Sequence, residues 1–177
     1  RRVHWRSTAR RGDLMVRREE QPWQSRTTLL LDRRRSAHRG DGATSTFEWA
    51  VSAIASLAVH LAGRGYSIRM VDGSPADTTT GLPWADGHSG LPASDAAGAV
   101  LDVLATVAPG GSVDLSRAVS AAAHGATGGL LVAALGRLRT GDSTLLAGVH
   151  QPGTHCVALV PAEPPDGAGH APSAQHG

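Results

Sequence analysis

A strand–helix–strand pattern constrains the fold of this chain more than any other feature of its sequence. Residues 27–32 (TTLLLD) form a short, continuous apolar run that ends in an acidic residue. Continuous rather than alternating hydrophobicity is typical of a strand that is buried on both faces of a parallel sheet. Residues 66–72 (YSIRMVD) predict the next strand. Two such strands joined by a helix form a parallel crossover unit, and these units are almost always right-handed.

The helix between the two strands has a clear start and one apolar side. Ser45 and Glu48 have the spacing of a capping box, in which the two side chains reciprocally satisfy free backbone amides. Gly63 and Gly65 end the helix. The apolar stripe repeats every three or four residues and consists of Phe47, Val51, Ile54, Ala58 and Leu61. Ser52, Ser56 and His60 interrupt the helix, so no stretch reaches the roughly 18 apolar residues of a membrane span.

The rest of the chain continues the alternation of helices and strands. We expect helices over residues 94–107, 114–124 and 140–150, and strands over residues 130–135 and 155–160. In the first of these helices, Ala97, Leu101, Leu104 and Ala108 lie on one side. Four core strands that alternate with helices predict an α/β fold of the Rossmann type, with a parallel-dominated sheet flanked by helices. Residues 161–177 are rich in Pro, Gly and Ala, and we expect a disordered tail.

The single cysteine, Cys156, lies in an apolar run and is interpreted as a buried strand residue. It cannot form an internal disulfide, which is compatible with a reducing compartment.

Basic residues are concentrated at the front of the chain. All 17 basic residues are arginine, and 12 of them lie in residues 1–39 against four acidic residues. The remaining residues carry five arginines and 11 acidic residues. This asymmetry predicts a basic face that meets an acidic protein surface, phosphate groups or lipid headgroups. The alternative to a basic binding face is a compositional bias of a GC-rich genome, which also favours arginine over lysine.

Residues 2–17 (RVHWRSTARRGDLMVR) resemble the characteristic segment of the domain-of-unknown-function 58 family. In that family, an Arg-x-(Ile/Val)-His-Trp-(Lys/Arg)-x-(Ser/Thr)-Ala-Arg core precedes a Gly-(Glu/Asp)-Leu-x-Val strand. The residues that carry the resemblance are Arg2, His4, Trp5, Thr8, Ala9, Arg10 and Gly12. The resemblance extends over residues 2–160, and residues 21–23 and 28–32 continue it as actinobacterial members do.

The resemblance implies a von Willebrand factor A-like domain over residues 27–160, with Asp32 ending its first core strand. Residues 1–26 would be the family's characteristic segment with an edge strand over residues 14–18. The family's usual Tyr-x-x-Gly-Asp stretch is missing, so we expect an N-terminally truncated chain. Two membrane helices and a β-rich segment would precede it. The full-length protein would then lie on the cytoplasmic side of the membrane, whereas this fragment would be soluble.

The resemblance also implies a partner. Genes of this family often neighbour those of a MoxR-type AAA+ ATPase and a transglutaminase-like protein, which suggests a chaperone or assembly role with that ATPase.

Metal-binding von Willebrand A domains hold Mg²⁺ with an Asp-x-Ser-x-Ser segment after the first strand, together with hydroxyl and carboxylate oxygens from neighbouring loops. Here Asp32 and Ser36 fit that pattern, but Arg34 replaces the middle serine. No aspartate follows the strand over residues 130–135. We therefore expect no cofactor and no Mg²⁺, with Asp32 and Ser36 as the remaining metal candidates.

An anion site is the other expectation for this region. Ligands of open α/β sheets bind at the carboxyl ends of the strands. Arg33, Arg34, Arg35 and Arg137 would gather there, and guanidinium groups suit carboxylate or phosphate. The alternative is a solvated loop in which Asp32 pairs with one of these arginines or caps a turn.

No feature of the sequence indicates catalysis. The nine histidines share no metal-ligand spacing, and neither a phosphate-binding loop nor a dinucleotide fingerprint follows any strand. We therefore expect no catalytic residue and no enzyme activity.

The function expected is a non-enzymatic protein-binding or assembly module that works with the MoxR-type ATPase. One alternative is an adhesive domain that depends on a divalent cation. The other is a nucleic-acid binder that uses the basic front end with Trp5. Glu19 and Glu20 dilute that patch and only six aromatic residues exist, so no nucleic-acid partner is expected.

Overall fold

In the computed structural model, residues 2–3, 16–17, 26–73, 93–110, 114–124 and 129–162 are described. Their centre is a four-stranded sheet in the order β4-β3-β5-β6, and every pair of neighbours is parallel. The strands are β3 (Arg26–Leu31), β4 (Ser67–Val71), β5 (Leu130–Ala134) and β6 (His155–Leu159). The chain thus has the Rossmann-like α/β fold that its sequence predicts.

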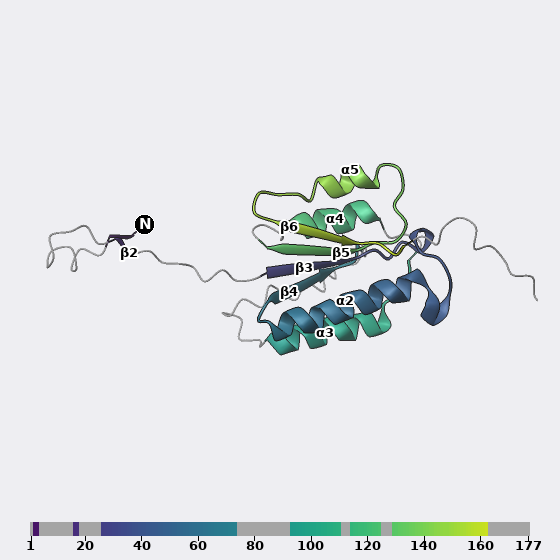
Figure 1. The fold of residues 1–177 in the computed structure, drawn as a ribbon, viewed down its shortest axis with the longest axis horizontal. Helices are drawn as coiled ribbons and strands as arrows, with labels where there is room; N and C mark the ends of the chain where they lie inside the picture. The colour runs from purple at the N-terminus through teal and green to yellow at the C-terminus, as the bar shows by residue number, and fades with distance from the viewer. Residues whose placement is uncertain are drawn as a thin grey trace, which may run out of the picture.

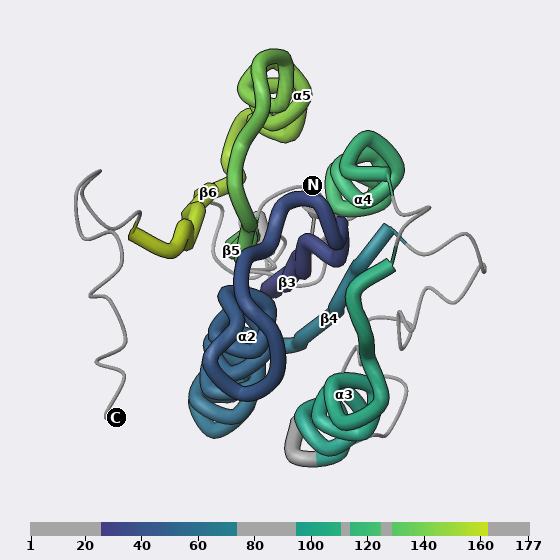
Figure 2. The backbone as a smooth tube through the Cα atoms, turned by 90° about the vertical axis from the view of Figure 1, so that its right-hand side faces the viewer, coloured from purple at the N-terminus to yellow at the C-terminus, as the bar shows by residue number. Residues whose placement is uncertain are grey.

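Two helices cover each face of the sheet (Figures 1 and 2). The helices α2 (Thr46–Gly63) and α3 (Ala93–Thr106) lie on one face. On the other face lie α4 (Leu115–Ala123) and the short α5 (Asp142–Ala147). Two 3₁₀ turns, η1 (Arg35–Ala37) and η2 (Gly42–Thr44), connect β3 to α2. The chain therefore leaves β3 for β4 on one side and later returns to β5 on the other, so the direction of winding reverses between β3 and β5.

The two faces of β3 explain its continuous apolar sequence. Leu29 and Leu31 belong to the core beneath α2 and α3, together with Phe47 and Ile54. Leu30 points into the second core, beneath α4 and α5. All three leucines are fully buried, so both faces of the strand require apolar side chains.

Helix α2 begins as the sequence predicts, but only half of the capping box forms. The Ser45 hydroxyl accepts a hydrogen bond from the backbone N–H of Glu48 at 3.1 Å. The N–H of Ser45 donates to the carbonyl of Gly42 at 3.1 Å, in place of the Glu48 side chain. The turn η2 therefore supplies the second half of the cap.

The length and mean hydropathy (1.2) of α2 are those of a membrane span, contrary to the sequence-based expectation. The same composition is found in core helices. Here six residues of α2 are buried beneath the sheet: Phe47, Ala50, Ile54, Ala58, Leu61 and Ala62.

Three expectations for the elements are wrong. Leu101 is 37% exposed because α3 packs through Ala97, Val100 and Leu104, a stripe shifted from the one predicted. Cys156 is exposed rather than buried, because β6 is the edge strand and its residues 155–158 are all exposed. The edge strand expected over residues 14–18 does not join the four-stranded sheet, since β2 (Val16–Arg17) pairs antiparallel with β1 (Arg2–Val3) in a sheet of its own.

The expected tail lies mostly outside the described residues, as does most of the loop between β4 and α3.

The packing of α2 gives a first prediction. Replacement of Ile54, which is fully buried between helix and sheet, by alanine should lower the free energy of unfolding by about 2–5 kcal/mol, because the cavity cannot fully collapse. Val59 lies on the same helix and is 53% exposed, so Val59→Ala should change it by less than about 0.5 kcal/mol. Denaturant titration of both variants checks this, and equal losses would contradict the placement of α2.

Candidate functional site

The candidate site lies at the carboxyl ends of β3 and β5, where the winding direction reverses. Open α/β sheets bind ligands at such a point because the two adjacent loops part there. Asp32 follows β3 directly, and its backbone N–H donates to the carbonyl of Ala134 at the end of β5 at 2.9 Å. This bond extends the ladder by one step and holds Asp32 in the crevice, where it is 2% exposed.

Both carboxylate oxygens of Asp32 are bound by the protein itself. Oδ1 accepts hydrogen bonds from the backbone N–H and the Nε of Arg34, at 3.1 and 2.9 Å. Oδ2 accepts from Nη2 of Arg34 at 2.8 Å and from the backbone N–H of Gly136 at 3.2 Å. Asp32 and Arg34 therefore form a two-pronged ion pair, the geometry in which a guanidinium binds a carboxylate most strongly.

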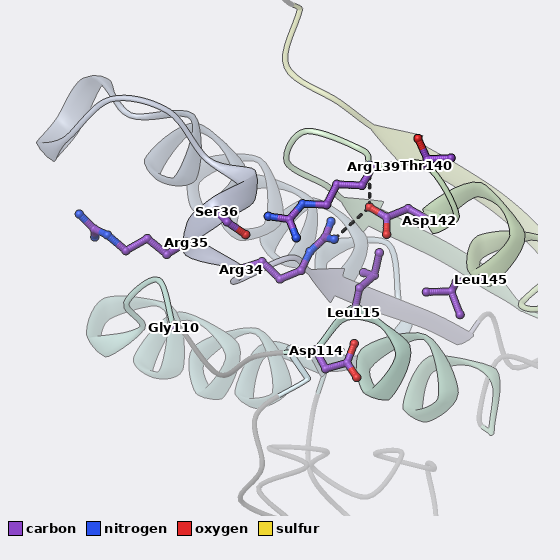
Figure 3. Close-up of a pocket in the computed structure, with 10 residues that line it drawn as sticks. All are labelled: Arg34, Arg35, Ser36, Gly110, Asp114, Leu115, Arg139, Thr140, Asp142 and Leu145. Atoms are coloured by element: carbon purple, nitrogen blue, oxygen red, sulfur yellow. Dashed lines mark hydrogen bonds and ion pairs between the residues drawn. The ribbon is translucent and has the colours of Figure 1, made fainter.

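A second carboxylate completes the arrangement. Nη1 of Arg34 donates to Oδ2 of Asp142, in the first turn of α5, at 2.9 Å. The backbone N–H of Arg139 donates to the same oxygen, also at 2.9 Å. Figure 3 shows the Arg34 guanidinium pointing toward Asp142, with both contacts dashed. Asp32, Arg34 and Asp142 are named the carboxylate–guanidinium cluster below.

The contacts of the cluster shift the pKa values of Arg34 and Asp142. The hydrogen bond to Asp32 raises the pKa of the Arg34 guanidinium above its usual value, although burial acts in the opposite direction. Burial alone would raise the pKa of Asp142, but the hydrogen bonds from the Arg139 backbone and from Arg34 outweigh it and lower that pKa. Arg34 and Asp142 are therefore both charged at neutral pH.

The other predicted arginines do not join the cluster. Arg33 pairs with Asp72, after β4, at 2.6 Å. Arg35 contacts Asp41 at 3.5 Å in an exposed position, and Figure 3 shows it pointing away from Asp142. Each arginine of the 33–35 run therefore pairs with a different aspartate, and the expected anion-binding group does not form around all of them. The alternative pairing of Asp32 with one arginine is the one observed.

Arg137 is also apart from the cluster. Its side chain is exposed and lines a separate pocket of about 380 Å³ beside Leu138 and Val160. Its backbone N–H donates to the carbonyl of Ala37 at 2.7 Å.

Three contributions to the site were missed at the sequence level. Asp142 is 108 residues from Arg34, and no local pattern marks it. Gly136 approaches η1 so closely that a Cβ would lie 2.4 Å from the carbonyl oxygen of Ala37. His38 lies with Nε2 2.6 Å from the carbonyl oxygen of Asp32 and its ring edge-on to Phe47. His38 thus joins the site to the core beneath α2.

A pocket of about 570 Å³ opens above the cluster. Arg34 and Asp142 lie in its wall, and its exposed polar residues include Arg35, Ser36, Arg139 and Thr140. Asp114 also lines it, but its carboxylate caps α4 by accepting from the N–H and hydroxyl of Ser116, at 2.9 and 2.6 Å. These bonds lower the pKa of Asp114. A guanidinium has five N–H donors, and three of those of Arg34 bind Asp32 and Asp142.

The cluster does not fit a metal ion. Within the described ranges, no group of three or more His, Cys, Asp or Glu side chains could hold one. Arg34 binds both oxygens of Asp32, so the pair proposed as metal candidates, Asp32 and Ser36, lacks a free carboxylate edge.

Most residues of the family segment lie outside the described part of the chain. Arg2 belongs to β1. Those without a described position are His4, Trp5, Thr8, Ala9, Arg10 and Gly12.

The sequence model of one family, described as "Protein of unknown function DUF58", matches residues 1–124. The matched part includes Asp32 and Arg34, whereas Gly136 and Asp142 follow it. No curated protein and no solved structure matches the chain.

The lowered pKa of Asp142 gives a second prediction. A depressed carboxyl pKa contributes stability that is present above the unfolded value of about 3.9 and is lost as pH falls through the folded value. Asp142→Asn should therefore be less stable than wild type at pH 7, and the difference should shrink below about pH 4. Urea titrations of both proteins from pH 7 to well below pH 4 provide the measurement. A difference that stays constant with pH would contradict the lowered pKa of Asp142.

Proposed function

The chain belongs to the DUF58 family, and from this premise we propose that it is a non-enzymatic protein-binding module. Its docking surface would be the carboxyl edge of the sheet around the 570 Å³ pocket. The observation that supports the proposal most is that the arginines of this edge differ in burial. Arg34 is buried in ion pairs within the cluster. Arg35 and Arg139, by contrast, are exposed at the rim of a pocket at the carboxyl edge of the sheet, where such folds bind ligands.

The chemistry of the rim favours an acidic group on the partner. Guanidinium groups bind carboxylates with two parallel hydrogen bonds, and Ser36 and Thr140 add hydroxyl donors beside them. Neighbouring apolar side chains, Leu115 and Leu145, would contact the stem of an inserted aspartate or glutamate. A partner that inserts one acidic side chain would therefore gain charge-assisted hydrogen bonds together with apolar contact.

We propose that the domain belongs with the von Willebrand A-like folds, as a member of the actinobacterial type. The proposed partner is the AAA+ ATPase of the MoxR type whose gene often neighbours those of the family. In this proposal the full-length protein is membrane-anchored, with this domain on the cytoplasmic side. The support is the family membership and the pocket at the carboxyl edge of the parallel sheet.

A charge reversal at the rim tests the proposal. The bait is the full-length protein, and the lysate is freed of nucleotide by gel filtration so that EDTA does not act through ATP binding. Wild type should retain an AAA+ ATPase in Mg²⁺ and in EDTA alike. Arg139→Glu should reduce retention by about tenfold or more, because a like charge then meets the partner's acidic group.

The matched control is Arg64→Glu, which changes the net charge equally but lies at the C-cap of α2, at the opposite end of the sheet. If both variants lose retention of the ATPase equally, only long-range attraction between the charges of the two proteins is involved, and the docking surface is refuted. Retention that disappears in EDTA would favour the adhesive, cation-dependent alternative. If no ATPase is retained by wild type, the proposed partner is wrong.

A further inference from the structure

Two buried carboxylates from distant parts of the chain face the same guanidinium. Asp32 and Asp142 are 2% and 7% exposed, and Arg34 between them is 8% exposed. Buried carboxylates require a bound cation or several hydrogen-bond donors, since their loss of hydration is otherwise uncompensated. Arg34 supplies both, with contacts of 2.8–2.9 Å to the two side chains.

We propose that Arg34 is the resident cation of this site. Its guanidinium takes the place that a divalent metal ion would occupy between Asp32 and Asp142, and the site becomes a divalent-cation site when Arg34 is replaced by serine. The inference does not depend on which partner, if any, docks at the rim.

The oxygen atoms around the guanidinium support this proposal. Without the side chain of Arg34, the carboxylates of Asp32 and Asp142 face a shared space. Ser36 lines the same pocket and could add a hydroxyl. A serine at position 34 would add a second hydroxyl and complete the Asp-x-Ser-x-Ser spacing. Two carboxylates, hydroxyls and water are hard oxygen ligands, which suit Mg²⁺, Mn²⁺ and Ca²⁺.

A covalently attached cation has a consequence for the wild-type protein. A metal ion leaves when its concentration falls, whereas Arg34 is held by the backbone of the same loop as Asp32. The positive charge at this edge is therefore independent of divalent cations and of chelators. Compared with a metal-binding von Willebrand A site, this site then differs in its cation, a guanidinium in place of a metal ion.

The test compares thermal melting of wild type and Arg34→Ser in a metal-free buffer and in millimolar Mg²⁺, Mn²⁺ or Ca²⁺, at constant ionic strength. Wild type should not respond. Arg34→Ser should melt below wild type in the metal-free buffer and regain about 3–6 °C when a metal is present at roughly ten times its dissociation constant. Calorimetric titration of the variant with Mn²⁺ should show one binding site.

Two matched variants isolate the cause. Arg33→Ser removes the neighbouring arginine, which pairs with Asp72 and not with the cluster, and it should remain insensitive to metal. Arg34→Ser combined with Asp32→Asn should lose the response, because the main carboxylate ligand is gone. The proposal is overturned if Arg34→Ser folds and does not respond, or if the double variant responds as strongly as the single one.

A second set of variants applies even if Arg34→Ser fails to fold. Arg34→Met leaves two buried carboxylates without a cation, whereas Asp32→Asn/Arg34→Met/Asp142→Asn removes all three charges. If Arg34 acts as their cation, the triple variant should be more stable than Arg34→Met, as judged by the denaturant midpoint. A triple variant that is equally or less stable would show that Arg34 acts through packing alone and would overturn the proposal.

Discussion

The buried contact of Arg34 with Asp32 and Asp142 is the interaction on which the functional edge of this fold depends. It joins the end of β3 to the first turn of α5, two segments separated by 108 residues. Loss of one partner from a buried ion pair typically costs about 3–5 kcal/mol, because the remaining charge stays buried without compensation. The cluster is therefore a structural cross-link between the two halves of the doubly wound sheet, and the pocket lies directly above it.

Backbone contacts hold the same region from the other sides. Gly110, before α4, donates to the carbonyl of Arg33 at 2.8 Å and accepts from the N–H of Arg35 at 3.2 Å, so the run bearing Arg34 is paired along its length. Gly136 supplies an N–H to Asp32 and approaches η1 more closely than any side chain would permit. Loops from three crossovers thus converge on the carboxylate–guanidinium cluster. Their contacts fix the positions of the exposed arginines around it.

The order of elements followed from local patterns, whereas the composition of the site did not. The strands around Leu29–Leu31 and the start of α2 were predictable, because burial on both faces and an N-cap each require particular residues nearby in sequence. The apolar side of α3 was misplaced, since an alanine-rich helix offers several nearly equivalent stripes and only packing chooses among them. Cys156 was misplaced because an apolar strand does not reveal that it forms the edge of its sheet. The pairing of Asp32 with an arginine was one alternative from the sequence, but the choice of Arg34 and the presence of Asp142 depend on tertiary contacts.

In the structure, the arginines of the run Arg33–Arg35 have two different roles, ion pairing within the fold and exposure at the rim of the pocket. Arg33 and Arg34 neutralise carboxylates that follow β4 and β3 or begin α5, so their replacement would change the stability of the fold as well as any ligand binding. Arg35 is exposed, and its contact with Asp41 spans 3.5 Å between two exposed side chains, so it can exchange this partner for another at little cost. Arg139 contributes its backbone to the cluster and its exposed side chain to the rim. The cluster therefore fixes the position of a rim arginine whose guanidinium stays exposed, and a docking surface can change in affinity while the buried charges beneath it remain paired.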